Sequence, residues 1–535
     1  MNTRASENSA SRGLALVRSV ALSPLQLESA ALLLICLTLS VGAFLCFPLY
    51  DDGWMALVLR ESGPRWLAQH MGDRPFVGFL LERVASFGPA NRLVFVILNA
   101  VLWLVFAIES LILFRELFPE FKDYSMVAAC LTLAPIVLQT QLSTAVVVIP
   151  ANLATILGYA SILVLLWHGR AYKAGRPLLV AAAATLAALA VALSEYGVAT
   201  NLVGSAILIG VALASSGRET RRRLLLSAVW LFALTVAAYL IFTKLADFSA
   251  RPDISPAQMV HRGAAKWLEV PFDVLAGAWH ALIGAYATAF GTITFAWDSK
   301  STLVGSLCGL LVAILLGLAI QRRRAGISAE ESVRRLTVRA AFLLPSVLVG
   351  LVPFRVMGRP TTLLEFGSRF RIPIMPVAGA ITLVLILGLV RPALRWIPVA
   401  MFGLLIGYAS WTFTYNAIEQ SRSIAALETA LKPYVARAGG FTVAIVPFNR
   451  FESELTANIS STWPVDLEKR LWVVGVEPAR TQFGNRNTCR PNMALDTHVR
   501  GLARAGKLDQ LLWVEAPPGR PVSIEPYCLT QNDNR

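Results

Sequence analysis

Hydrophobic residues in this chain lie in long runs that carry almost no charge, instead of alternating with polar residues. Apolar runs of about 18 residues or more are long enough to cross a lipid bilayer as helices. The tightest connections between runs are Ile149–Pro150 and Glu195–Tyr196. The pattern predicts an α-helical polytopic membrane protein with eleven spans, at 29–49, 93–114, 125–148, 151–168, 178–194, 197–214, 224–243, 301–320, 336–353, 373–390 and 396–415.

The C-terminal part of the chain has a different pattern, with shorter apolar runs and more polar residues. An amphipathic helix is expected at about 417–438, and a second helix near 495–507. Short β-rich runs predict strands, at 441–448, 471–477, 511–516 and 521–529. We therefore expect an N-terminal tail, a membrane domain and a small α/β domain, at 1–28, 29–416 and 417–535.

Basic residues predict the orientation of the spans. With the N-terminus in the cytoplasm, the inside segments hold 19 Lys and Arg in about 72 residues, and the outside loops hold 14 in about 124. Short loops rich in Lys and Arg stay on the cytoplasmic side. Clusters such as Arg221–Arg223 and Arg322–Arg324 therefore favour this orientation. Eleven crossings then put the C-terminal domain outside, together with three long loops, at 50–92, 244–300 and 354–372.

The segment at 271–297 does not fit this scheme directly, because it is apolar enough to span. If it crossed the membrane, the Arg322–Arg324 cluster would move to the outside. We therefore expect a re-entrant or interfacial helix on the outer face. A twelfth span is the alternative.

Composition supports the membrane assignment and narrows the function. The chain is 56% hydrophobic and only 15% charged, against roughly 25% charged residues in soluble proteins. Its net charge of +15 lies mainly at span ends, and no basic-aromatic stripe indicates nucleic-acid binding. In the tail, Cys489 and Cys528 would form a disulfide outside the cytosol; two free buried thiols are the alternative.

Two adjacent carboxylates follow the first span, in the sequence Tyr50-Asp51-Asp52-Gly53. Such a pair can supply a general base for proton abstraction. The alternative is a solvated cap on the next helix, since Asp favours helix starts. Further along the same loop, the planar guanidinium of Arg74 suits a phosphate, although pairing with Asp73 is an equal alternative.

Charged residues also occur at two later positions on the expected outer face. Glu195 interrupts an apolar stretch of nearly forty residues, and carboxylates at such depth usually face a cavity or a partner. A short outer turn that happens to carry Glu is the alternative. The loop at 354–372 concentrates four arginines, which suit an anionic ligand such as a lipid phosphate or lipid headgroups in general: Arg355, Arg359, Arg369 and Arg371. The histidines of the other long loop, including His280, fit no metal site and are interpreted as structural or interfacial.

These motifs resemble those of the GT-C superfamily of membrane glycosyltransferases. Tyr50-Asp51-Asp52 is similar to the aromatic-acidic-acidic start of the first outer loop in that superfamily. Ser194-Glu195-Tyr196-Gly197 resembles its short outer turn with a carboxylate. Gly367-Ser368-Arg369-Phe370-Arg371 resembles its Arg-aromatic entry to a late helix. The similarity covers about 29–415 and is nearest to bacterial enzymes that modify cell-envelope glycans.

The resemblance implies a hexosyl- or pentosyltransferase in the cytoplasmic (inner) membrane. Its partners would be a polyprenyl-phosphate-linked sugar donor, a glycan or lipid acceptor, and membrane lipids. Asp51 would be the base in an inverting transfer, and Asp52 would orient the acceptor or bind a divalent cation. Arg369 or Arg371 would hold the leaving phosphate. The remaining substrate-binding residues would be Arg74, Glu195 and Arg359.

Two other functions compete with this one. An envelope polysaccharide polymerase or ligase would also use polyprenyl-linked substrates and outer arginines, but it would not need acidic residues directly after the first span. A non-enzymatic transporter of lipid-linked glycans usually shows inverted repeats, and the sequence contains no clear internal repeat. A non-catalytic scaffold would leave the arginines of the outer loop and Glu195 unexplained.

Overall fold

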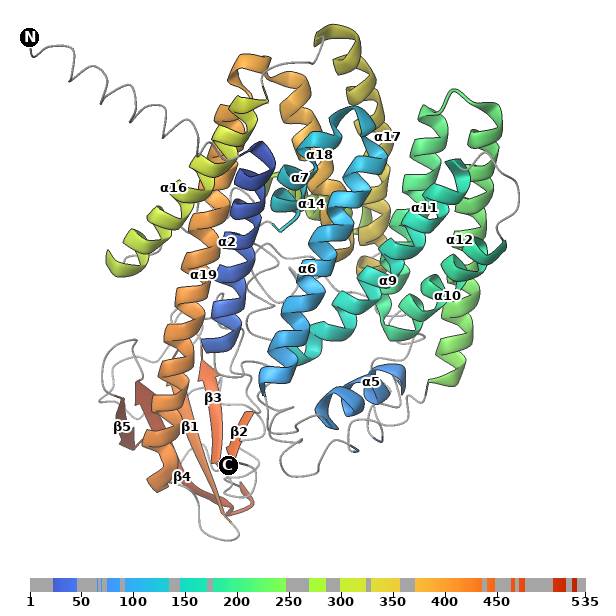
Figure 1. The fold of residues 1–535 in the computed structure, drawn as a ribbon. Helices are drawn as coiled ribbons and strands as arrows, with labels where there is room; N and C mark the ends of the chain where they lie inside the picture. The colour runs from blue at the N-terminus through green and yellow to red at the C-terminus, as the bar shows by residue number, and fades with distance from the viewer. Residues whose placement is uncertain are drawn as a thin grey trace, which may run out of the picture.

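The fold is a bundle of long helices with a small β-sheet at one end (Figure 1). It is seen in a computed structural model. Short amphipathic helix α5 (Pro75–Ser86) lies at the same end of the bundle as the sheet (Figure 1). The structure describes residues 23–45, 65, 69, 75–86, 92–133, 145–170, 177–246, 269–284, 299–323, 329–356, 371–434, 440–447, 463–466, 471–476, 504–515 and 522–526.

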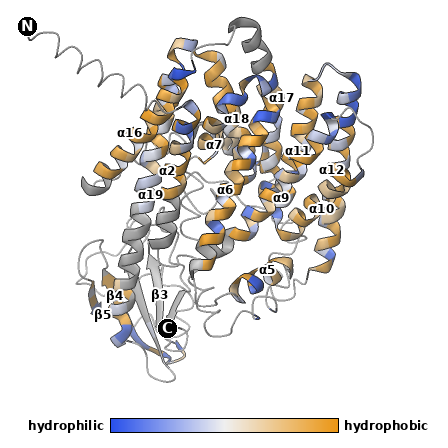
Figure 2. Cartoon of the chain, in the orientation of Figure 1, coloured by the Kyte–Doolittle hydropathy of each residue, from blue (hydrophilic) through white to orange (hydrophobic). Residues whose placement is uncertain are grey.

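Most of the described helices are apolar along their length (Figure 2). Two of them have apolar stretches shorter than a full span, α2 (Pro24–Leu45) and α10 (Pro177–Leu193). In the described part of the chain, eight are long and apolar enough to cross a membrane: α6 (Arg92–Leu117), α9 (Ala145–Arg170), α11 (Glu195–Ala214), α12 (Arg218–Leu245), α16 (Ser299–Arg322), α17 (Ala329–Val356), α18 (Met375–Leu389) and α19 (Trp396–Leu431).

The predicted connection at Ile149–Pro150 is wrong. Helix α9 runs through Pro150 without interruption, so residues 145–148 belong to α9 and not to the preceding span. Proline is tolerated inside membrane helices because neighbouring helices and side chains satisfy the freed backbone groups. The span expected at 125–148 begins as the short helix α7 (Ser125–Thr132), which follows the 3-10 turn η1 (Pro119–Tyr124) and packs against α18.

The predicted boundary between the membrane domain and the C-terminal domain, at 416/417, falls inside a helix. The last expected span and the amphipathic helix are one continuous helix of 36 residues, α19. At 1.5 Å per residue this helix is about 54 Å long, which exceeds the roughly 30 Å hydrocarbon core of a bilayer. Helix α19 therefore carries the chain directly from the bundle to the sheet (Figure 1).

The C-terminal sheet is mixed, with five strands in the order β2-β3-β1-β4-β5. The central strand β1 (Phe441–Pro447) is parallel to β3 (Leu471–Val476) and β4 (Leu508–Glu515). The edge strands β2 (Trp463–Asp466) and β5 (Ser523–Pro526) are antiparallel to their neighbours. Strands thus occur at all four predicted places, and β2 is one that the pattern did not predict.

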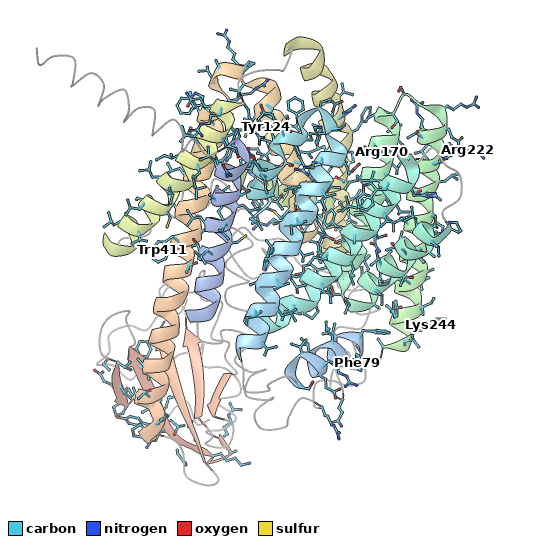
Figure 3. All side chains as sticks on the ribbon, viewed as in Figure 1. Phe79, Tyr124, Arg170, Arg222, Lys244 and Trp411 are labelled. Atoms are coloured by element: carbon cyan, nitrogen blue, oxygen red, sulfur yellow. The ribbon has the colours of Figure 1, made fainter. Side chains whose placement is uncertain are left out.

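Ion pairs gather at the end of the bundle opposite the sheet. Glu116 at the end of α6 pairs with Arg170 at the end of α9, with 2.5 Å between Oε2 and Nη1. Arg339 of α17 pairs with Glu120 of η1 at 2.6 Å. Figure 3 shows Arg170 at this end and Lys244, at the end of α12, at the other. The ends of α6 and α9, which lead into loops expected on the cytoplasmic side, therefore meet in space.

Helices α10 and α11 meet in a very tight turn. Leu193 ends α10, Glu195 begins α11, and the hydroxyl of Ser194 caps α11 by accepting a hydrogen bond from the backbone N–H of Tyr196 at 3.2 Å. A Cβ atom on Gly197 would lie 2.0 Å from the backbone oxygen of Ala190. The turn predicted at Glu195–Tyr196 is therefore confirmed, and only glycine fits directly after it.

Replacing Gly197 with alanine is expected to lower the free energy of unfolding by about 1–3 kcal/mol, because the new methyl group overlaps the backbone of α10. Thermal unfolding of the purified protein in detergent measures this change. The matched control is Gly217→Ala, since a Cβ at Gly217 meets nothing nearer than the Thr220 hydroxyl at 3.5 Å. Equal stability of the two variants would contradict the expectation.

Candidate functional site

The predicted site residues fall into two groups. Asp51, Asp52, Arg74, Arg359 and Arg369 lie outside the residues that the structure describes. Glu195 and Arg371 belong to the described residues. The structure shows the contacts of these two residues.

Arg371 is completely buried, with 0% of its surface exposed. It begins the helical turn at 371–374 that leads into α18. Its Nη1 donates a hydrogen bond to the backbone oxygen of His280 at 3.1 Å. His280 starts η3 (His280–Gly284), a π-helical segment that continues α14 (Val270–Trp279). Short π-helical insertions are frequent at functional sites, and this one presents a backbone acceptor to a buried guanidinium.

A tyrosine from a third helix fixes the segment that carries Arg371. The hydroxyl of Tyr159, in α9, donates a hydrogen bond to the backbone oxygen of Pro373 at 2.6 Å. Only 1% of the Tyr159 surface is exposed. Because the acceptor lies two residues after Arg371, this bond holds the start of α18 against α9.

Arg355, the first of the four clustered arginines, has an acidic partner. Its guanidinium forms an ion pair with the carboxylate of Asp273, which joins the end of α17 to α14. The short helix α14 packs against α17, and the apolar side chains on its other face, Phe272 and Leu275, are exposed. The described part of the 271–297 segment is thus a short helix anchored by an ion pair and not a full-length span.

Glu195 lies at the α10–α11 turn, at the first position of α11. It is close enough to Tyr239 of α12 for the two groups to interact electrostatically. The ring of the next residue, Tyr196, packs edge-on against Phe354 with 5.2 Å between centroids. Phe354 precedes Arg355, so the Glu195 turn touches the end of α17.

These contacts connect the described site residues. From the turn at Glu195 they pass through Phe354 to the Arg355–Asp273 pair, then along α14 to His280, and from there to Arg371. We call this set the buried polar centre; Tyr159, Tyr196, Phe354, Arg371 and Pro373 are its buried members, and Glu195, Asp273, His280 and Arg355 are partly exposed at its edge. The structure thereby links two residues that lie 176 positions apart in the sequence.

Sequence reasoning missed several members of the buried polar centre. His280 was interpreted as structural or interfacial, and its role here belongs to its backbone oxygen, which no side-chain pattern predicts. Asp273 was a detectable signal, as one carboxylate within the apolar 271–297 segment. Tyr159 was a weaker signal, as a phenol within an apolar run. Among the described residues no group of His, Cys, Asp and Glu is arranged to hold a metal ion.

Long apolar helices, ion pairs at one end and a buried polar centre define the class: this is a helical, multi-pass membrane protein. Comparison with models of protein families gives no match, and comparison with curated proteins gives no significant match either.

Proposed function

We propose that this protein is an inverting membrane glycosyltransferase of the GT-C type. It transfers a sugar from a polyprenyl-phosphate donor to an envelope glycan or lipid acceptor. The reaction takes place at the outer face of the cytoplasmic membrane. In this proposal the ion-pair end of the bundle faces the cytoplasm, and the end with α5 and the sheet faces outward.

The observation that carries the proposal is the burial of Arg371 within a bundle of apolar helices. Ionisable residues inside a membrane domain are costly and mark substrate or ion pathways. Arg371 belongs to the motif that resembles the phosphate-binding motif of the superfamily. It is positioned by a backbone oxygen from η3 and by the Tyr159–Pro373 bond. A rigidly held guanidinium suits a phosphate leaving group, on which charge develops in the transition state.

The residues divide the chemistry as follows. Asp51 takes the proton of the acceptor hydroxyl, whose oxygen attacks the anomeric carbon of the donor. The bond between that carbon and the phosphate oxygen breaks, and polyprenyl phosphate leaves toward Arg371 or Arg369. Asp52 orients the acceptor or binds a divalent cation, while Arg74, Arg359 and Glu195 contact the substrates.

Replacing Asp51 with asparagine is expected to abolish sugar transfer while the protein still accumulates in the membrane, because the amide cannot accept the proton. Glycan profiling of the envelope from cells with the wild-type protein, with the variant and without the protein measures this. The control is Asp73→Asn, which alters a carboxylate of the same loop that has no role in the proposed transfer. Wild-type glycan in the Asp51 variant removes Asp51 from the role of base.

The same experiment separates the competing functions. A polymerase or ligase would change the length or attachment of a glycan without removing one sugar from its repeat. A transporter of lipid-linked glycans would leave the intact intermediate on the inner side of the membrane. Loss of a single sugar linkage supports the transferase. Either of the other two outcomes supports the corresponding competing function instead.

A further inference from the structure

Helix α6 carries a carboxylate that the proposed transfer does not use. Glu109 lies inside the apolar stretch Ile97–Leu117 and is only 9% exposed. Its Oε2 atom is enclosed and has no hydrogen-bond partner among the described residues. None of the ion pairs found in that part of the chain includes Glu109. A buried carboxylate without a cation is strongly disfavoured, so we expect Glu109 to be protonated.

Polar and aromatic side chains near Glu109 follow one face of α6. Asn99, Trp103, Phe106 and Glu109 succeed one another at intervals of three or four residues, which places them on the same side of a helix. All four are buried. From Asn99 to Glu109 the helix rises about 15 Å, so this face extends through much of the bundle.

Helix α9 packs against that face of α6. The side-chain amide of Asn152 donates a hydrogen bond to Oδ1 of Asn99 at 2.9 Å. Seven residues further along α9, the ring of Tyr159 meets Phe106 edge-on, with centroids 6.3 Å apart. The phenol of Tyr159 thus lies about one helical turn from Glu109 along this face of α6. The α6–α9 interface is therefore polar at both ends of the stretch from Asn99 to Glu109.

Three buried polar atoms along this interface have no hydrogen-bond partner among the described residues: Oδ1 of Asn152, Nε1 of Trp103 and Oε2 of Glu109. A single atom of this kind in a protein interior calls for an explanation. For three such atoms along one helix pair the same explanation applies, because internal water bridges buried donors and acceptors. They include an acceptor, a donor and a protonated carboxyl, which is what a hydrogen-bonded chain requires.

We propose that internal water along the α6–α9 interface connects Glu109 to solvent at the end of the bundle near α5. Asn99 lies toward that end, since Glu116 near the other end of α6 belongs to the ion-pair end. Glu109 is thus an intramembrane protonation site whose proton exchanges through the polar face of α6. This inference does not depend on glycosyl transfer.

Infrared spectroscopy of the purified full-length protein in lipid nanodiscs tests this site. The wild-type protein is expected to show a protonated carboxyl band that is absent from Glu109→Gln, a change that keeps the shape of the side chain. After transfer to D2O the band is expected to shift within minutes, because the proton exchanges. Absence of a band that depends on Glu109, or a band that does not shift, would overturn the proposal.

Two variants test the route. Asn152→Leu removes the amide that bonds to Asn99 at the start of the route. Trp103→Phe removes the indole N–H and keeps an aromatic ring. If one variant fails to fold, the other still tests the route. Each is expected to slow deuterium exchange about tenfold, because the path loses one hydrogen-bonding group. The matched control is Thr235→Val, since the hydroxyl of this buried threonine bonds to the Leu231 oxygen within its own helix, α12. Exchange at the wild-type rate in both route variants would overturn the route.

Discussion

Replacing Glu28 with alanine is expected to lower the free energy of unfolding by about 3–5 kcal/mol, the usual cost of removing one partner of a buried ion pair. The Glu28 side chain is fully buried, and its Oε2 lies 2.9 Å from Nη2 of Arg323, which is 14% exposed. The guanidinium of Arg323 also lies over the ring of Tyr124, 5.3 Å from its centroid. The substitution therefore leaves the largely buried guanidinium of Arg323 without its carboxylate partner, at the junction of α2, η1 and α16.

Burial raises the pKa of Tyr124, so its hydroxyl stays protonated and the ring remains a neutral surface for Arg323. The Arg323–Tyr124 contact uses no atom of Glu28, so Glu28→Ala removes the ion pair and keeps both partners of that contact. Arg323→Met alone should also be costly, since it leaves the carboxylate of Glu28 buried without a cation.

Unfolding in detergent, followed by heat or denaturant, measures the change. The matched control is Glu219→Ala, which removes the exposed partner of Arg223 within α12 and should change stability by about 0.3–0.5 kcal/mol. The double variant Glu28→Leu with Arg323→Met should be more stable than either single variant, because no buried charge remains. A double variant that loses the sum of both effects would show that the pair is not coupled.

Replacing Arg371 with lysine is expected to reduce sugar transfer by about 10²–10³-fold, the usual loss when one stabilising donor is removed from a transition state. Lysine keeps the charge but not the planar fork of donors. It would also lose the geometry of the hydrogen bond to the His280 oxygen, and hydrogen bonds of charged groups contribute about 1.5–3 kcal/mol to stability. Loss of folded protein is a separate effect, so transfer has to be compared at equal amounts of folded protein.

Transfer assayed with membranes that contain equal amounts of folded protein measures this effect. The matched control is Arg170→Lys, because the Arg170 guanidinium bonds to Glu116 at the opposite end of the bundle. That variant should lose some stability and keep wild-type transfer. Equal activity of the two variants would exclude a role for Arg371 in the reaction.

The contrast between α9 and the α10–α11 turn shows why some connections were predicted and others were not. At Glu195 the polar sequence coincides with a cap, a close helix contact and a real turn. At Pro150 the same reasoning failed, because whether a proline breaks a helix depends on partners that neighbouring helices supply. The continuity between the last span and the amphipathic helix of 417–438 was also missed. The change from apolar to amphipathic sequence there does not end the helix, and α19 runs through it.

By itself the sequence determined the membrane class, the positions of most long helices, the strands of the C-terminal sheet and the segments that share the ion-pair end. These features follow from local hydrophobicity, strand propensity and charge, which each stretch of chain carries independently. Only the tertiary structure decided that Arg371 bonds to the oxygen of His280, that Arg355 pairs with Asp273 and that Asn152 of α9 bonds to Asn99 of α6. Such contacts depend on how each helix is rotated and placed against helices distant in the sequence, and apolar runs without a strong polar face do not encode that rotation.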